Sequence, residues 1–175
     1  MAADIMSSIN DTDAAQMLSE RDPDDAAELV GELDYDKAEK LLRLMGVKEQ
    51  RAVRQLLGYK EDTAGRIMTS EVVDLFENDT VADAVEVLSN LDEDFETIHY
   101  IYIKDKDDKL TGAVSLNALL LAKDEDHLKD IADIEDLKTA NPDDDQEDVA
   151  EDIAKYNLLA MPVVDDQGHL LGNVT

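Results

Sequence analysis

The chain is 175 residues long and carries 44 aspartate and glutamate residues against 16 lysine and arginine residues, a formal net charge of −28. Such an acidic chain is repelled by nucleic acid phosphates and anionic lipid headgroups, so we expect no nucleic acid partner. The absence of cysteine excludes disulfides and thiolate metal sites. Hydrophobic residues make up 43% of the chain, enough for a core. The acidity fits either a merely solubilising surface or carboxylates that converge and need a cation.

The sequence shows neither a membrane span nor a catalytic motif. Its longest apolar runs, such as residues 118–122, fall short of the ~20 residues that cross a bilayer, and the N-terminus lacks a signal-peptide pattern. The sequence therefore predicts a soluble, cytosolic chain. The three histidines lie far apart without a zinc-binding spacing, and there is no GxSxG motif. We expect no enzymatic activity.

A period of twelve residues runs through the first third of the chain. Alanine recurs at positions 2, 14, 26 and 38, and an apolar pair recurs at 5–6, 17–18, 29–30 and 41–42. Each unit predicts a short helix opened by a polar or acidic cap, with the apolar pairs forming a shared core. The helical pattern continues with looser spacing through residues 46–57 and stops after Gly58. We expect a helical repeat domain over residues 1–62, truncated at its start.

From Arg66 onward the pattern changes to strand, helix, strand, strand, helix. Strands are predicted at residues 72–73, 99–103 and 110–114, and helices at residues 80–91 and 116–122. The order then recurs, with a helix over residues 143–156 and a strand over residues 160–164.

Two segments, residues 103–115 and 163–175, align without a gap at an offset of sixty residues. We therefore expect two copies of one module, over residues 63–136 and 137–175. The second copy stops before its closing helix, which predicts that the chain is a fragment with an uncovered apolar face.

At these residues the sequence resembles tandem cystathionine-β-synthase-type modules, known as CBS domains. The segments YKEDTAGRIMTSE (59–71), ETIHYIYI (96–103) and DDQEDVAEDIAKYNLLAMPVVDDQGHLLGNVT (144–175) resemble the cytosolic region of MgtE-type magnesium transporters. The implied fold class is α+β: a superhelical array of short α-helices followed by tandem β-α-β-β-α CBS modules, the second truncated.

The resemblance implies an intracellular magnesium sensor that gates a membrane magnesium pore in the same full-length chain. The implied partners are Mg²⁺, the transmembrane pore domain, and a second copy bound through the CBS modules. In the full-length protein this region would lie at the cytoplasmic face of the cell membrane.

The resemblance also assigns candidate magnesium ligands. They are the carboxylates of Asp145 and Glu147 within DQEDVA, that of Asp24 within PDDAAEL, and a backbone carbonyl at Gly65 within AGR. Asp25 is the alternative to Asp24, and Arg66 is the alternative to Gly65. From the residues alone, the acidic run that contains Asp145 and Glu147 is equally well explained as a solvated helix cap. Where the family has an acidic residue after the helix-ending tyrosine, this chain has the neutral Asn157.

A second hypothesis is an adenine-nucleotide-responsive or purely dimerising CBS scaffold. CBS modules often hold ribose with an aspartate three residues after the Ser or Thr that ends the hairpin. Counted from Ser115, that position is Ala118, so the first module lacks this carboxylate. The second module ends before the corresponding position. The ion-sensing hypothesis is therefore preferred.

Overall fold

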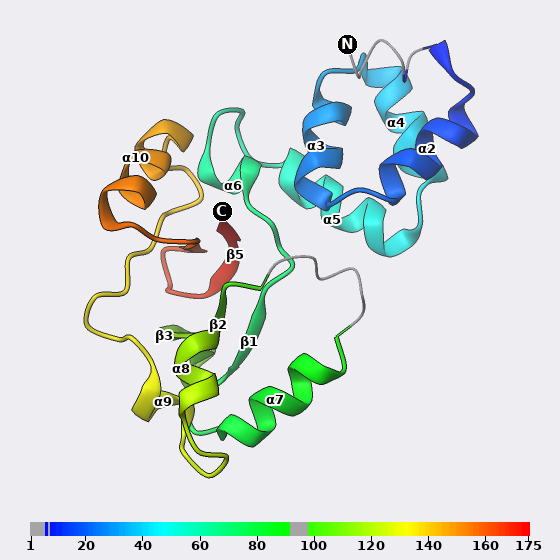
Figure 1. Ribbon diagram of the computed structural model, residues 1–175. Coiled ribbons are helices and arrows are strands. Elements are labelled where there is room, and N and C mark those ends of the chain that lie inside the picture. Colours follow the sequence, from blue (N-terminus) through cyan, green and yellow to red (C-terminus); the bar gives the residue numbers. More distant parts are fainter. Residues whose placement is uncertain (1–5, 7, 92–97) are drawn as a thin grey trace.

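The computed structural model describes residue 6, residues 8–91 and residues 98–175. Figure 1 shows a cluster of helices that contains the N-terminus and a larger α/β part that contains the C-terminus. The predicted repeat positions Ala2 and Ile5 lie outside the described residues, as do residues 96–97 of the segment 96–103.

The twelve-residue period corresponds to four helices whose first residues are spaced by twelve. They are α2 (Asp11–Ser19), α3 (Pro23–Gly31), α4 (Tyr35–Leu44) and α5 (Val47–Leu57). Polar caps start two of them: the side chain of Asn10 accepts a hydrogen bond from the N–H of Asp13, and that of Asp34 from the N–H of Lys37. The predicted array of short capped helices is confirmed.

One of the two predicted apolar columns forms the core of this array. Its members are each at most 2% exposed: Met6, Leu18, Val30 and Leu42. The other column is less uniform, because Met17 is 42% exposed. Ala15 and Ala27 are buried instead, one residue after the repeating alanine. On a helix these positions share a stripe with Leu18 and Val30, whereas Met17 falls on its edge.

The first module is a three-stranded sheet flanked by helices. Strand β1 (Val73–Phe76) pairs in parallel with β2 (Tyr100–Lys104), which pairs antiparallel with β3 (Leu110–Ser115). Its helices are α7 (Val81–Ser89), α8 (Leu116–Leu121) and α9 (Leu128–Ile131). The first strand begins one residue later and runs three residues further than the sequence predicted. Helix α7 starts after Thr80, which forms a capping box with Asp83.

The second module consists of α10 (Gln146–Tyr156) and a hairpin of β4 (Met161–Val164) and β5 (Leu170–Val174). The prediction that this helix begins at residue 143 was wrong by three residues. The side chain of Asp145 accepts a hydrogen bond from the N–H of Glu147 at 2.8 Å and makes Asp145 the N-cap. The helix ends at Asn157, whose left-handed φ of 52° stops it.

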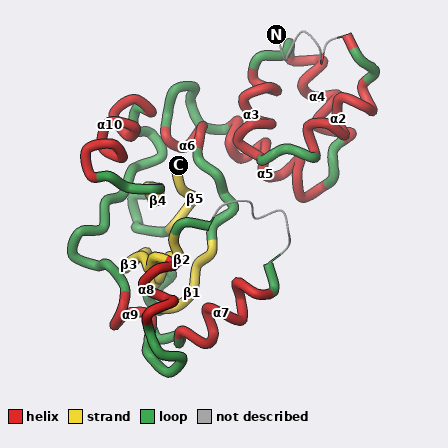
Figure 2. Tube along the Cα trace, viewed as in Figure 1, coloured by secondary structure: helices red, strands yellow, loops and turns green. Residues whose placement is uncertain are grey.

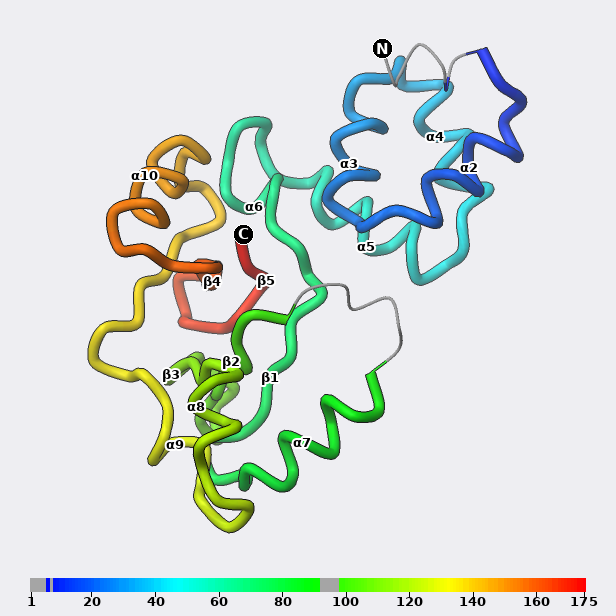
Figure 3. Tube along the Cα trace, viewed as in Figure 1, coloured from blue at the N-terminus to red at the C-terminus, as the bar shows by residue number. Residues whose placement is uncertain are grey.

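Each hairpin pairs with a backbone segment from outside it, and one of these pairings joins the two modules. Thr69, which precedes the first sheet, pairs with Asn173 on β5 through hydrogen bonds of 2.8 and 2.9 Å. In the same way Asp133, which precedes the second module, pairs with Ala113 on β3 through bonds of 3.1 and 2.9 Å. Ala113 and Asn173 are sixty residues apart, so the sequence repeat corresponds to an equivalent pairing. Figure 3 shows the chain near Thr69 running beside β5.

Glycine permits this close approach. An added Cβ at Gly172 would overlap the carbonyl oxygen of Thr69, and one at Gly112 would lie 3.0 Å from that of Asp133. Each repeated glycine therefore accommodates the backbone of the segment that pairs with its hairpin.

The pairing of Thr69 with β5, together with two further backbone hydrogen bonds, attaches the start of the first module to the second. The N–H of Ala64, in the short helix α6 (Ala64–Ile67), donates to the carbonyl of Asp144, and that of Gly65 donates to Pro142. One apolar core runs from the N-terminal helices through Ala64 and Met68 to α10 and the second hairpin. Figure 2 shows α6 between these two groups of elements. Among the described residues, no helix is both long and apolar enough to cross a membrane.

Replacing Gly172 with alanine should destabilise the chain by about 1–3 kcal/mol, because the methyl group would displace the backbone of Thr69. Urea unfolding measures the loss. The control is Gly46→Ala, whose methyl group would meet only the flexible side chain of Glu49, and which should cost less than about 1 kcal/mol. Equal losses in the two variants would show that the Thr69 pairing does not hold the modules together.

Candidate cation site

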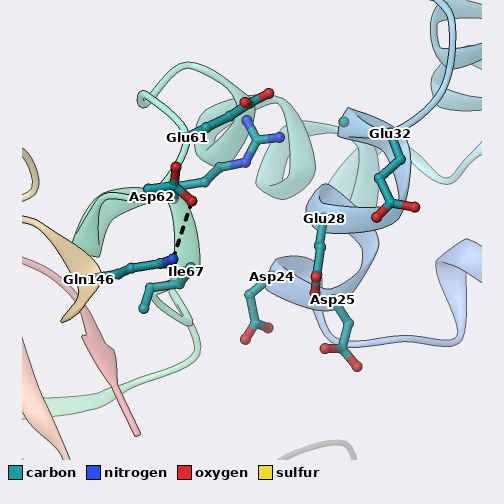
Figure 4. A pocket seen from close by; sticks show the side chains of 10 residues that line it. Asp24, Asp25, Glu28, Glu32, Glu61, Asp62, Ile67 and Gln146 are labelled. Carbon is teal, nitrogen blue, oxygen red and sulfur yellow. Dashed lines mark hydrogen bonds between the residues drawn. The ribbon is translucent and has the colours of Figure 1, made fainter. Parts of the chain in front are cut away.

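A cavity of about 380 Å³ lies where α3 faces the loop after α5. Most of its lining side chains are acidic: Asp24, Asp25, Glu28, Glu32, Glu61 and Asp62. Arg66, Ile67, Gln146 and Gly31 complete it. Figure 4 shows the four carboxylates of the α3 segment on one side and Glu61, Asp62 and Gln146 on the other.

Helix geometry explains the acidic side of α3. Asp24, Glu28 and Glu32 are spaced by four residues, so they follow one face of the helix and its C-cap. Proline at the first helical position and aspartate in the first turn favour a helix start here. The neighbouring apolar face is buried through Ala26, Ala27 and Val30, which directs the carboxylates outward into the cavity.

Asp24 stands out among these carboxylates. Its Oδ1 is buried and has no hydrogen-bond partner. Burial raises the pKa of Asp24, and the nearby charges of Asp25 and Asp22 raise it further, against the lowering effect of backbone N–H groups. A buried carboxylate oxygen without a hydrogen-bond donor is energetically unfavourable, and a bound cation would offset this cost.

The opposite side of the cavity is held by the start of α10. Asp62 has a left-handed φ of 61°, a conformation that aspartate tolerates better than most residues. Its carbonyl accepts the N–H of Gln146 at 2.9 Å, and its carboxylate accepts the side-chain amide of Gln146 at 3.2 Å. Asp62 is thereby fixed on the second module, facing α3.

The structure brings only one of the four predicted ligands into the lining of this cavity. Asp24 lines it, together with its alternative Asp25. Asp145 and Glu147 flank Gln146 but are exposed and do not line the cavity, because neighbours on a helix point about 100° away. Gly65 is buried, and its N–H is bonded to Pro142 at 2.9 Å. The roles of these three residues stay predictions.

Several lining residues were missed by sequence reasoning. Glu28 and Glu32 could have been predicted from the sequence, because they follow Asp24 at a spacing of four residues and so lie on the same helix face. Glu61, Asp62 and Gln146 could not, because only the pairing between the modules places that loop beside α10. Within the part of the chain that the structure describes, no group of three or more acidic or histidine side chains is arranged to hold a metal ion directly.

The raised pKa of Asp24 has a consequence for stability. Because folding raises this pKa above the ordinary 3.8, ionisation of Asp24 opposes folding. The penalty is fully present above the folded-state pKa and is lost as the pH falls towards 3.8. In metal-free buffer at pH 7, Asp24→Asn should therefore raise the free energy of unfolding by more than the roughly 0.5 kcal/mol scatter of surface substitutions. The gain should shrink as the pH approaches 4.

Urea unfolding at several pH values measures this difference. Asp25→Asn is the matched control, because this substitution removes the same charge one residue away, from a side chain that is exposed. If both variants gained equally, net charge and not the burial of Asp24 would be responsible.

Comparisons with known proteins identify the family of this chain. The sequence pattern of the MgtE intracellular N domain matches residues 1–62, and that of the CBS domain matches residues 64–125 and 128–175. The chain is 43% identical over 111 residues to the magnesium transporter MgtE of Enterococcus faecalis, and 39% identical over 113 residues to that of Thermus thermophilus. Each alignment covers 63% of this chain and 24% of the transporter, so the chain spans about a quarter of these relatives.

Two solved structures match almost the whole chain. The soluble part of a magnesium transporter has a TM-score of 0.89 and 38% identity, covering 99% of this chain and 68% of that one. The cytosolic domain of the Mg²⁺ channel MgtE in complex with ATP has a TM-score of 0.86 and 31% identity, covering 99% and 75%. These matches confirm the predicted fold class of a helical region followed by CBS modules. The chain belongs to the MgtE magnesium transporter family, of which it comprises the N domain and CBS domains.

Proposed function

We propose that this chain is the magnesium-sensing regulatory region of a transporter, and that it gates a membrane magnesium pore in the same full-length protein. On this proposal it lies at the cytoplasmic face of the membrane and divides into residues 1–62, 63–136 and 137–175. The single observation that carries the proposal is the buried, unpartnered Oδ1 of Asp24 in an acidic cavity between the N domain and the CBS part.

The donor set suits magnesium. Mg²⁺ is a hard cation that prefers oxygen ligands and keeps several waters, so it needs few direct protein ligands. Asp24 would supply a carboxylate oxygen from the N domain, and Glu61 and Asp62 would face it from the loop. Asp145, Glu147 and the carbonyl of Gly65 would bind at or beside the same seam between the domains, as the resemblance to the family implies.

Bound ions would act by offsetting repulsion. Carboxylates on α3 and on the loop repel one another across the cavity, which favours separation of α3 from the loop that is attached to the second module. A divalent ion reverses the sign of this interaction. At ten times its Kd, an ion that binds only the closed arrangement favours it by about 1.4 kcal/mol, so several sites would have to act together.

We further propose a homodimer through the CBS modules. Helix α8 leaves Leu120 and Leu121 82% and 80% exposed, which is unusual for adjacent leucines at a surface. A second copy would cover them. The dimer would couple ion binding in two chains to one pore.

A second candidate function, nucleotide binding, is favoured by one observation. A cavity of about 260 Å³ lies between the two modules and is lined by Tyr100, Tyr102, Ser115, Lys138 and Pro162, among others. One structural relative is described in complex with ATP. Aromatic rings and a lysine suit a base and a phosphate, although Ala118 in this lining offers no carboxylate for a ribose.

The ion-sensing proposal predicts that Mg²⁺ draws the domains together. Because the chain has no cysteine, spin labels can be placed at Gln55→Cys on α5 and Ala154→Cys on α10, both exposed and neutral positions. Labelled chain is diluted with unlabelled chain so that distances come from one molecule. Mg²⁺ should shorten and narrow the distance distribution, with a midpoint on the order of millimolar for an ion that keeps most of its waters.

Asp24→Ala should raise the magnesium midpoint by about fivefold or more, because one charge interaction with the bound ion is lost. Asp107→Ala, in the turn between β2 and β3, should leave it unchanged. A sodium salt at matched ionic strength should not reproduce the effect. If it does, or if the two variants behave alike, the response to Mg²⁺ comes from generic charge screening and not from a defined site. Closure by ATP in the presence of chelator would instead support the second candidate.

A further inference from the structure

The acidic cavity already contains one cation of its own. Arg66 belongs to α6 and lines the cavity together with six carboxylates. Its Nη2 donates a hydrogen bond to the carbonyl oxygen of Ala27, in α3, at 3.4 Å. This hydrogen bond joins the N-terminal helices to residues 63–175.

The guanidinium group lies against the last turn of α3. It sits so close to Gly31 that a Cβ at this position would overlap Nη2. The carboxyl end of a helix carries partial negative charge from its free carbonyl groups, so a cation is favoured there. Glycine at position 31 leaves the space that the guanidinium fills.

Arg66 is nevertheless not paired with any single carboxylate. Across the described residues it forms no ion pair within 4.0 Å, whereas Arg54 is bonded to both carboxylate oxygens of Glu39. A guanidinium that is close to many carboxylates but paired with none partly neutralises all of them. Such a charge is displaced more readily than a bidentate ion pair.

We propose that Arg66 is a tethered cation that occupies this cavity when no divalent ion is bound, and that Mg²⁺ must compete with it. Arg66 docks the loop onto α3 and relieves part of the repulsion between their carboxylates. It thereby weakens Mg²⁺ binding and sets the concentration at which the region responds. This inference rests on the proposed function, because it concerns the regulation of the same site.

The test is the magnesium midpoint of the doubly spin-labelled chain at low ionic strength. Arg66→Ala should lower the midpoint by about threefold or more, because a positive charge near the divalent ion is removed. It should also broaden the metal-free distance distribution, because the contact with Ala27 is lost. Arg43→Ala makes the same change in net charge on α4, where Arg43 lines a different cavity, and should leave both readouts nearly unchanged.

Gly31→Ala provides a second variant that keeps every charge. Its methyl group would occupy the position of Nη2, and the flexible arginine side chain can move away without disturbing the backbone. This variant should broaden the metal-free distribution as Arg66→Ala does. An unchanged distribution in both variants would overturn the docking role of Arg66.

Other results would contradict the proposed competition between Arg66 and Mg²⁺. An equal fall of the midpoint in Arg66→Ala and Arg43→Ala would assign the effect to net charge, and a rise in Arg66→Ala would mean that the guanidinium supports ion binding. Either result overturns the inference while leaving the proposed function intact. If the unmodified chain shows no response to Mg²⁺, the proposed function fails, and competition by Arg66 fails with it.

Discussion

The proposed function depends on repulsion across the cavity between α3 and the loop that follows α5. Asp24, Glu28 and Glu32 face Glu61 and Asp62, and Asp24 is partly removed from water. With a net charge of −28, few of the remaining residues can offset this repulsion. On the proposed function, the position of the N domain would depend on the cations in the cavity, whether these are supplied by the chain or by the solution.

The fold makes this interaction consequential by fixing one side of it. The loop before α6 is hydrogen-bonded to the second module through Asp62 with Gln146, and the start of α6 through Ala64 with Asp144. The pairing of Thr69 with Asn173 then continues this attachment into β5. On the proposed function, a change in the cavity would therefore act on both modules.

Local patterns in the sequence were enough to predict most of the fold. The twelve-residue spacing located four helices, and the sixty-residue offset located both hairpins, because hydrophobic period and capping residues are local properties. The start of α10 was misplaced because several neighbouring acidic residues suit an N-cap equally well, and only the structure shows that Asp145 fills this role. The pairing of Thr69 with Asn173 was not predicted, since these residues are more than a hundred positions apart and no local signal connects them.

The same distinction applies to the site. Asp24 was reached through the resemblance to the transporter family, and Glu28 and Glu32 follow from their helical spacing. Which residue at the start of α10 faces the cavity depends on long-range hydrogen bonds, and these select Gln146 instead of Asp145 or Glu147. Arg66 was considered only for its carbonyl, whereas its side chain is what enters the cavity.

The most direct test of this account is to locate a divalent ion. Mn²⁺ shares the preference of Mg²⁺ for oxygen ligands and gives an anomalous X-ray signal that waters do not. Crystals of the chain grown with Mn²⁺ should show a peak in the cavity, bonded to the carboxylate of Asp24. Ordered ions found only elsewhere, with the cavity still filled by Arg66 and water, would contradict the claim that this cavity is the cation site.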